Sequence, residues 1–361
     1  MIEKKRITQI SLGDGYAGSA KFAILSSAAF ARMGHDVQVV VSESSLTEKR
    51  ARDMGLLTAT LSVENEALQL ATLKKNLDQF RPEFVIAHHS RERKFLMQLR
   101  RQEGRKFFAI AFRNIVSRSF PIFSSIPYNL WLDLNVACGK GVARSLIVRG
   151  ILPSKVRVVY NGIEPYSGNI KPIQKSELGC DADCHIIGMS AWFHPKRKGF
   201  DILFKALSQG LPLPYKIMFL GIVDEHRAQV QQMAQRYGIE PNAFIFPGYV
   251  ENTWRYYQAM DVFVLPSREE GFSLSLLEAM TCRLPCIASN IPGNNEAIQH
   301  DVTGKLFPIH RPNLLRDALI ELLTDSSKAA RIGEAACQRV LNNFTIEKVT
   351  ESFDRVLGEL K

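Results

Sequence analysis

The sequence predicts an α/β protein with two domains, each built on a parallel sheet. Its 361 residues exceed what one compact core holds and suit two domains of about 150–200 residues. Residues 261–290, DVFVLPSREEGFSLSLLEAMTCRLPCIASN, have the order strand, loop, helix, strand. Residues 7–41 show the same order around a glycine-rich turn. Strands joined by crossover helices pair in parallel, so both halves favour parallel sheets.

In the first half, short apolar runs alternate with segments of helical periodicity. Strands are expected at 7–12, 37–41, 84–87, 107–112, 134–138 and 156–164, and helices at 22–33, 68–80 and 141–149. Residues 165–183 are polar and broken by proline and glycine, which is typical of a linker. The first domain is therefore expected to cover residues 1–164.

The second half repeats this alternation and defines a second domain at residues 184–342. Strands are expected at 185–190, 216–220, 244–248, 261–266, 286–289 and 303–308, and helices at 202–208, 227–237, 254–260, from 274, 314–324 and 329–342. Residues 343–361 read as a separate amphipathic helix.

Two carboxylates flank a predicted helix start in the central segment. Ser273 is expected to cap the helix, Glu270 precedes it in the loop, and Glu278 stands about 7 Å along its axis. Free N–H groups of the helix start and Gly271 form a site for an anion. A diphosphate there would have one carboxylate for a ribose and one for a hexose. The alternative is a solvated loop glutamate and a surface helix glutamate.

Composition and charge indicate where the protein is located and which partners it binds. The net charge is +10, which favours phosphate-rich partners, and no run of eighteen apolar residues predicts a membrane span. The N-terminal segment lacks the apolar centre of a signal peptide, so we expect a cytoplasmic protein. The spacings of Cys180 with Cys184 and of Cys282 with Cys286 would allow zinc, but buried free thiols are favoured. No Asp-x-Asp motif follows a strand, so no metal and no cofactor are expected.

Residues 91–118 carry nine basic residues against two acidic ones, and aromatic residues continue to 131. This pattern favours peripheral contact of residues 91–131 with an anionic membrane or acceptor. Removing the charges of Arg100, Arg101 and Arg105 is then expected to weaken binding to anionic vesicles. The alternatives are a plain solvated face and, less favoured, nucleic acid, for which no recognition motif is present.

The segment E-G-F-S-L-S-L-L-E-A-M, followed by P-C-I-A-S-N and P-G-N-N-E, resembles the retaining glycosyltransferases of family 4, within glycosyl transferases group 1. The resemblance covers nearly the whole chain. It implies the GT-B fold, in which two Rossmann-like domains with parallel sheets face a cleft. The first domain would then bind the acceptor, the second would bind the nucleotide-sugar donor, and the last helix would cross back onto the first.

The resemblance also implies roles for single residues. Arg197 and Lys198 would clamp the diphosphate, although the family more often separates such a pair by several residues. Glu270 would hold the sugar hydroxyls and Glu278 the ribose. The remaining donor contacts would be Gly18, Tyr249, Val250, Gly271, Phe272, Ser273 and Leu274. Asp14 and Gly15, in the glycine-rich turn, would face the acceptor. The alternative is that the glycines serve only to shape a tight turn.

Two adjacent histidines, His88 and His89, end a predicted strand. In the family a histidine at this place borders the sugar subsite, and adjacent side chains point in different directions, so at most one of the two is expected there. We expect His88 to act in catalysis and His89 to lie on the acceptor side. A structural histidine is the alternative.

The reaction implied by the resemblance is transfer of a hexose from a nucleoside diphosphate sugar, UDP ahead of GDP, to a hydroxyl of a glycan acceptor with retention. The leaving phosphate would take the acceptor proton. A lipopolysaccharide-core or other cell-envelope glycan precursor is the favoured acceptor. The alternatives are a nucleotide-sugar 2-epimerase on the same fold and a degenerate nucleotide-sugar-binding or membrane scaffold protein.

Overall fold

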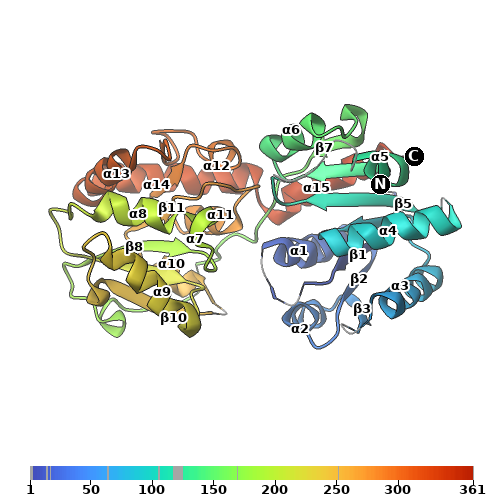
Figure 1. The fold of residues 1–361 in the computed structure, drawn as a ribbon, viewed down its shortest axis with the longest axis horizontal. Helices are drawn as coiled ribbons and strands as arrows, with labels where there is room; N and C mark the ends of the chain where they lie inside the picture. Colours follow the sequence, from blue (N-terminus) through green and yellow to red (C-terminus); the bar gives the residue numbers. More distant parts are fainter. Residues whose placement is uncertain are drawn as a thin grey trace. The chain divides into compact units, whose positions relative to one another are not determined.

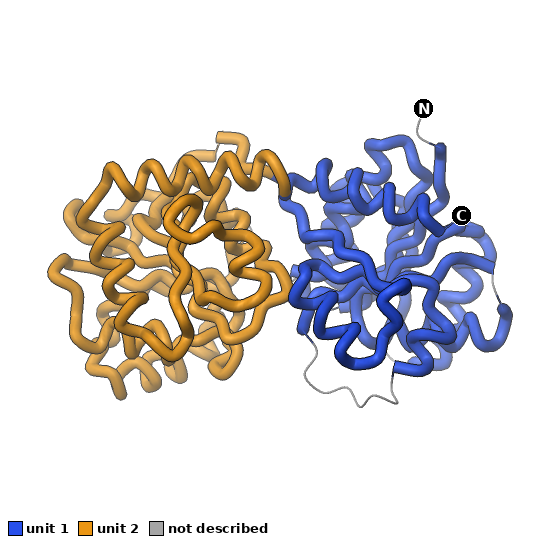
Figure 2. The backbone as a smooth tube through the Cα atoms, turned by 90° about the horizontal axis from the view of Figure 1, so that it is seen from above, with its two compact units in different colours: residues 1–164, 344–361 blue, residues 165–343 orange. Residues whose placement is uncertain are grey.

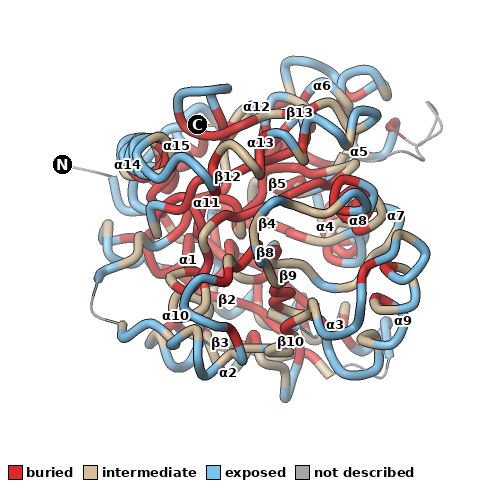
Figure 3. Tube along the Cα trace, turned by 90° about the vertical axis from the view of Figure 1, so that its left-hand side faces the viewer, coloured by how far each residue is buried: buried red, intermediate tan, exposed pale blue. Residues whose placement is uncertain are grey.

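The computed structural model describes residues 3–13, 15–16, 18–62, 65–104, 106–116, 125–168, 170–250 and 252–360. The chain divides into two compact units (Figure 2). Unit 1 comprises residues 1–164 and 344–361, and unit 2 comprises residues 165–343. Within each unit the strands are largely buried, whereas the outer helices expose one face (Figure 3).

Unit 1 is a seven-stranded sheet with helices on both faces (Figure 1). Its strands pair in the order β3-β2-β1-β4-β5-β6-β7, and every pairing is parallel. In chain order the elements are β1 (Arg6–Ser11), α1 (Gly18–Arg32), β2 (Asp36–Ser42), α2 (Leu46–Asp53), β3 (Leu57–Leu61), α3 (Glu66–Phe80), β4 (Phe84–Ala87), α4 (Ser90–Glu103), β5 (Phe108–Arg113), α5 (Ile126–Trp131), β6 (Leu134–Ala137), α6 (Lys140–Val148), β7 (Val156–Val158) and α15 (Ile346–Gly358).

The last helix, α15, belongs to unit 1 because its apolar stripe packs against α1. Phe353 is fully buried and its ring lies 5.6 Å from that of Phe30. The Ile346 N–H donates to the Ile163 carbonyl at 2.8 Å. A Cβ at Gly162 would come within 2.9 Å of the Ile346 Cα, so only glycine allows this approach of the two segments.

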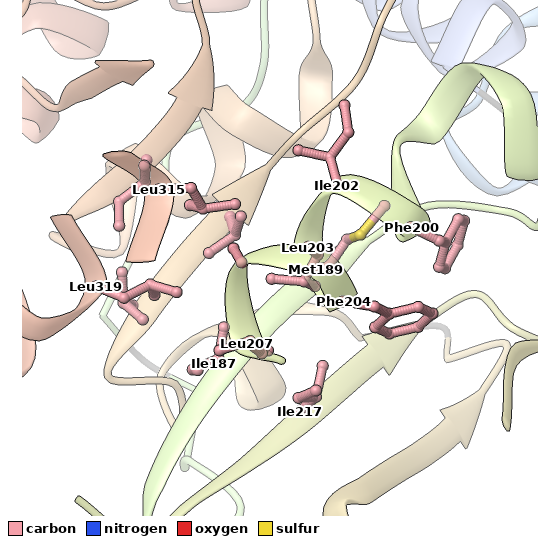
Figure 4. Close-up of a cluster of buried hydrophobic side chains, with 14 of the residues drawn as sticks. Ile187, Met189, Phe200, Ile202, Leu203, Phe204, Leu207, Ile217, Leu315 and Leu319 are labelled. Carbon is pink, nitrogen blue, oxygen red and sulfur yellow. The ribbon is translucent and has the colours of Figure 1, made fainter. Parts of the chain in front are cut away.

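Unit 2 is a six-stranded parallel sheet in the order β10-β9-β8-β11-β12-β13. Its elements are β8 (His185–Ser190), α7 (Pro195–Lys198), α8 (Phe200–Leu207), β9 (Tyr215–Leu220), α9 (Asp224–Gln235), β10 (Phe244–Gly248), α10 (Trp254–Tyr257), β11 (Val262–Leu265), α11 (Leu274–Thr281), β12 (Cys286–Ser289), α12 (Asn294–Ala297), β13 (Lys305–Phe307), α13 (Pro312–Thr324) and α14 (Ser326–Asn343). The core between the sheet and helices α8 and α13 is built of buried aliphatic and aromatic side chains (Figure 4).

The strand orders place one crevice in each unit. In an open parallel sheet, ligands bind beyond the carboxyl ends of the strands where the strand order reverses. That point lies between β1 and β4 in unit 1 and between β8 and β11 in unit 2. The loops after these four strands carry most of the residues that the sequence singled out.

The structure corrects three expectations for unit 1. Helix α1 begins at Gly18 rather than at residue 22. The basic stretch contains helix α4, which the sequence pattern did not predict. The burial of Phe112 agrees with the strand expected at residues 107–112, so part of the aromatic stretch is core. Arg100 is also buried and its guanidinium lies 3.0 Å from Asp133, so it is not a surface charge. Arg105 and residues 117–124 lie outside the described residues.

The six cysteines are free thiols, and five of them are buried. Cys282 is half-buried. Within the described ranges, no group of three or more His, Cys, Asp or Glu side chains could hold a metal ion. Over the same residues, no helix is both long and apolar enough to cross a membrane.

Candidate functional site

The centre of the candidate site in unit 2 is an ion pair between Lys198 and Glu270. The Lys198 ammonium lies 2.7 Å from Oε1 of Glu270, and the Ser267 hydroxyl donates to the same oxygen at 2.8 Å. Both charged side chains are about nine-tenths buried, with 12% and 9% of their surface exposed. The structure thus brings together a loop after β11 and the end of α7, which follows β8.

Two glycines allow the backbone to approach closely around this pair. Gly199 has a φ of 71°, and a Cβ there would lie 2.0 Å from the Pro266 carbonyl oxygen. Gly293 has a φ of 91°, and its Cβ would lie 2.4 Å from the Gly271 carbonyl oxygen. Any larger residue would therefore push the Glu270 loop out of place.

A buried network of polar side chains fixes the loop that carries Ser267 and Glu270. Ser289, at the end of β12, donates its hydroxyl to the Ser267 carbonyl. The Asn294 amide donates to the Ser289 carbonyl at 3.2 Å and to its hydroxyl at 3.1 Å. These three side chains are fully buried, so the position of the Ser267 hydroxyl, and with it that of Glu270, is fixed by β12 and α12.

Helix α11 begins beside this loop. Ser273 is its N-cap and accepts a hydrogen bond from the Leu276 N–H at 3.4 Å, as predicted. Phe272 and Leu274 are buried in the surrounding core, as is Gly271. The helix start therefore sits next to the carboxylate and ammonium of the ion pair, where its partial positive charge favours an anion.

Glu278 is not a surface residue. Only 5% of it is exposed, and its Oε2 accepts a hydrogen bond from the Tyr257 hydroxyl at 3.0 Å. Burial, together with the Glu278 charge, raises the pKa of Tyr257 well above its usual value, so the phenol stays protonated and donates. Tyr257 comes from α10 and was missed by the sequence reasoning, since twenty-one residues separate it from Glu278.

The basic residues before Gly199 take different positions. Arg197 lies in α7 with its Nε 4.0 Å from a carboxylate oxygen of Glu269, and its carbonyl accepts from the Arg268 N–H. Arg268, which the sequence reasoning also missed, binds Asp201 through two hydrogen bonds of 2.7 and 2.6 Å. That pair ties the loop after β11 to α8.

Tyr249 and Val250 follow β10, and Tyr249 is 55% exposed. They lie at the carboxyl end of the edge strand, two strands from β8, rather than beside the ion pair.

In unit 1 the two histidines differ sharply in environment. His88 is 2% exposed, and its Nε2 lies 2.7 Å from Oε1 of Gln9. Burial lowers the pKa of His88 to about 3, so the ring is neutral at neutral pH. A third of the His89 side chain is exposed. His89 is therefore the more exposed of the two histidines, and the assignment of His88 to catalysis stays a prediction.

Glu92 organises the loop around His89. Its fully buried carboxylate accepts from the backbone N–H groups of Leu12, His88 and His89, and from Nδ1 of His89 at 2.7 Å. Burial raises the pKa of Glu92, but these hydrogen bonds outweigh it and leave the pKa below its usual value. A glutamate three residues after a helix cap is a capping-box spacing, and that signal could have found Glu92.

The His89 ring is held in one tautomer and reaches Ser19. A carboxylate only accepts, so Nδ1 carries a proton, and Nε2 lies 2.7 Å from the Ser19 hydroxyl. Ser19 is in the first turn of α1, directly after Gly18. A Cβ at Gly13 would lie 3.5 Å from the ring. Gly15 is exposed with open space around it, and Asp14 lies outside the described residues.

Comparison with known proteins identifies the family of unit 2. Residues 171–339 match the model of the family described as glycosyl transferases group 1. Unit 2 belongs to the glycosyl transferases group 1. The two Rossmann-like units together form the GT-B fold. A solved structure of the Anabaena protein HepE in complex with UDP-glucose superposes with a TM-score of 0.85 and 18% identity, over 98% of this chain and all of that one.

Several curated proteins are similar to part of this chain. The N-acetyl-alpha-D-glucosaminyl L-malate synthase of Bacillus anthracis is 27% identical over 209 residues, which is 57% of this chain and 54% of that protein. The lipopolysaccharide core biosynthesis glycosyltransferase LpsE of Rhizobium meliloti is 23% identical over 204 residues, which is 56% of this chain and 58% of that protein. The match thus spans about half the length of these curated relatives.

Proposed function

We propose that this protein is a retaining glycosyltransferase of family 4 that moves a hexose from a UDP-sugar to a hydroxyl of an anionic cell-envelope glycan acceptor, such as a lipopolysaccharide core precursor. The observation that carries the proposal is the buried Lys198–Glu270 pair beside the capped start of α11. A solved structure of the same fold holds UDP-glucose, and one relative is named for lipopolysaccharide core synthesis.

The difficult part of the reaction is the charge that develops when the glycosidic phosphate bond breaks. Negative charge grows on the leaving diphosphate, and Lys198, Arg197 and the α11 start supply positive charge for it. Glu270 already accepts from Lys198 and Ser267, which aims the carboxylate and leaves further lone pairs for sugar hydroxyls. Glu278, held by Tyr257, takes the ribose hydroxyls.

The acceptor side of the proposal rests on unit 1. His89, rather than His88, contacts the acceptor or the transferring sugar, because His89 is the exposed ring of the two. The leaving phosphate oxygen takes the acceptor proton, so no metal and no protein nucleophile are needed. The residues that place His89 are Glu92 and Ser19.

We place the protein in the cytoplasm, with peripheral contact at the inner face of an anionic membrane. Exposed basic residues on α4, namely Arg91, Lys94 and Arg101, meet lipid phosphates. An apolar patch of Ile126, Leu130, Val148 and Leu152, each at least 49% exposed, enters the headgroup layer. Asn129 joins the two parts of this patch by hydrogen bonds to Gly150 and Leu152.

Vesicle flotation tests the membrane contact. The change Leu130→Ser is expected to weaken binding to vesicles that contain anionic lipid, and Leu68→Ser on α3, an equally exposed leucine, serves as the control. If both variants bind as the unmodified chain does, this patch is not the contact surface.

Donor turnover tests the proposed function itself. The purified chain is incubated with a series of UDP- and GDP-sugars, with and without EDTA, and sugar release is followed by NMR. We expect release from one UDP-sugar with unchanged anomeric configuration and no effect of EDTA. Inverted configuration would overturn the retaining mechanism. Formation of a 2-epimer without an acceptor would favour an epimerase, and no turnover of any donor would favour a scaffold protein.

A further inference from the structure

Arg113 is a buried cation without an acidic partner. It is the last residue of β5, only 6% of it is exposed, and its Nη1 has no hydrogen-bond partner. Among the described residues, no carboxylate forms an ion pair with it. Arg100, the other buried arginine of unit 1, differs in this respect, because it is paired with Asp133 at 3.0 Å. Tyr128 is a hydrogen-bond partner of Arg113, but no described carboxylate compensates its buried charge.

Two other side chains near the end of β5, those of Arg93 and Asn114, carry buried polar atoms without a hydrogen-bond partner. Arg93, in the first turns of α4, donates to the His88 carbonyl at 3.4 Å, while its Nε is buried without a partner. The side-chain amide of Asn114, the next residue in the chain, is also buried with both its oxygen and its nitrogen unpartnered. The Tyr128 ring lies 5.4 Å from the Arg113 guanidinium.

The charges of these arginines act on one another. Burial is the main cause that lowers the pKa of Arg113 to about 10, and the charge of Arg93 adds to it, as does that of Arg149. At neutral pH the guanidinium nevertheless stays charged. An unpaired buried charge is costly for a folded protein, and such a group is usually paired or binds an anion.

We propose that Arg113 and Arg93 form a binding site for a phosphate group of the acceptor. Two guanidinium groups without a carboxylate match the charge of a phosphate monoester, and the planar donors of arginine fit its oxygens. The site lies at the carboxyl edge of the unit 1 sheet, next to the strand that carries His89. The assignment of the phosphate to the acceptor rests on the proposed function, whereas the phosphate site itself does not.

Phosphate binding is measured on the full chain with UDP present at saturation, so that phosphate does not report on the nucleotide site. Inorganic phosphate and glycerol phosphate are titrated at constant ionic strength, and the melting temperature is followed. We expect both to raise it. Arg113→Gln should weaken phosphate binding about ten- to hundredfold, as expected for loss of a charged hydrogen bond. Arg52→Gln, an exposed arginine of α2 in the same unit, should leave it unchanged.

The stability of the free chain separates a binding arginine from a structural one. Removing an unpaired buried charge should leave the melting temperature of free Arg113→Gln unchanged or raise it, whereas loss of a structural arginine would lower it. Arg93→Gln, a half-buried position, gives a second test of phosphate binding if Arg113→Gln does not fold.

The possible results are distinct from those for the proposed function. No phosphate effect on the unmodified chain, or equal effects of Arg113→Gln and Arg52→Gln, would overturn the site. An equal effect of acetate would overturn its assignment to phosphate. Donor hydrolysis without an acceptor should persist in Arg113→Gln. If the unmodified chain binds phosphate through Arg113 but turns over no UDP-sugar, the proposed function fails and the phosphate site remains.

Discussion

The ammonium of Lys198 lies 2.7 Å from a carboxylate oxygen of Glu270, although 72 residues separate them in the chain. The two belong to loops that follow β8 and β11, the strands at which the order of the unit 2 sheet reverses. Each side chain compensates the charge of the other in the free protein. A bound diphosphate sugar would therefore meet a cation and a carboxylate that are already aligned.

Lys198→Ala is expected to lower kcat for donor turnover about 100- to 1000-fold, because it removes a preorganised positive charge from the leaving diphosphate. It also leaves Glu270 buried without its partner. The double variant with Glu270→Ala should therefore lose less unfolding free energy than the two single variants lose together. Lys205→Ala, an exposed lysine of α8, is the matched control. Steady-state kinetics and urea unfolding measure both effects, and additive losses would contradict the coupling.

Gly293→Ala is expected to reduce activity strongly in a protein that still folds. The added Cβ would lie 2.4 Å from the Gly271 carbonyl oxygen, which moves the Glu270 loop. Gly210 also has a positive φ, of 68°, but nothing lies within 4 Å of a Cβ added there by Gly210→Ala. Both changes should cost about 1 kcal/mol of stability from backbone strain, and only Gly293→Ala should lose turnover. Equal turnover of the two variants would show that the Gly293 contact does not position the site.

Glu92→Gln is expected to lower turnover about ten- to hundredfold while leaving the affinity for UDP unchanged. Glutamine cannot accept from three backbone N–H groups and from Nδ1 of His89 as the carboxylate does, so the ring loses its fixed tautomer. UDP binding is measured by calorimetry and turnover by kinetics. Glu103→Gln, on the same helix, is the control, and a matching loss in that variant would rule out a role of the His89 ring.

The stability of the chain should fall as the pH drops from about 6.5 towards 3, and His88 should account for part of this fall. Burial lowers the pKa of His88 from 6.5 to about 3. Between pH 6.5 and pH 3, His88 is therefore protonated in the unfolded chain and neutral in the folded chain. The contribution is fully present above pH 6.5 and is lost as the pH falls. In urea unfolding at pH 7, 6 and 5, His88→Gln should reduce the slope by up to about 1.4 kcal/mol per pH unit. An unchanged slope would show that His88 is not protected from protonation.

Much of the fold follows from local patterns in the chain. The strand, loop, helix and strand of residues 261–290 appear as β11, α11 and β12, and Ser273 caps α11 as predicted. These features depend on residues a few positions apart, namely apolar runs, a capping serine and a closing proline. The resemblance to a glycosyltransferase family arose from the same continuous segment, and the family match of unit 2 agrees with it.

Contacts between distant segments decided the rest. Which of two adjacent histidines reaches solvent depends on Glu92 and on the packing of Phe22 and Phe112 against His88. Arg100 and Arg113 look alike in a basic stretch, yet Arg100 is paired with Asp133, whereas Arg113 has no carboxylate partner among the described residues. Lys198 meets Glu270 only because parallel strands bring the ends of β8 and β11 to one edge of the sheet. Periodicity is local, whereas burial and charge pairing arise only when the folded chain brings remote residues together.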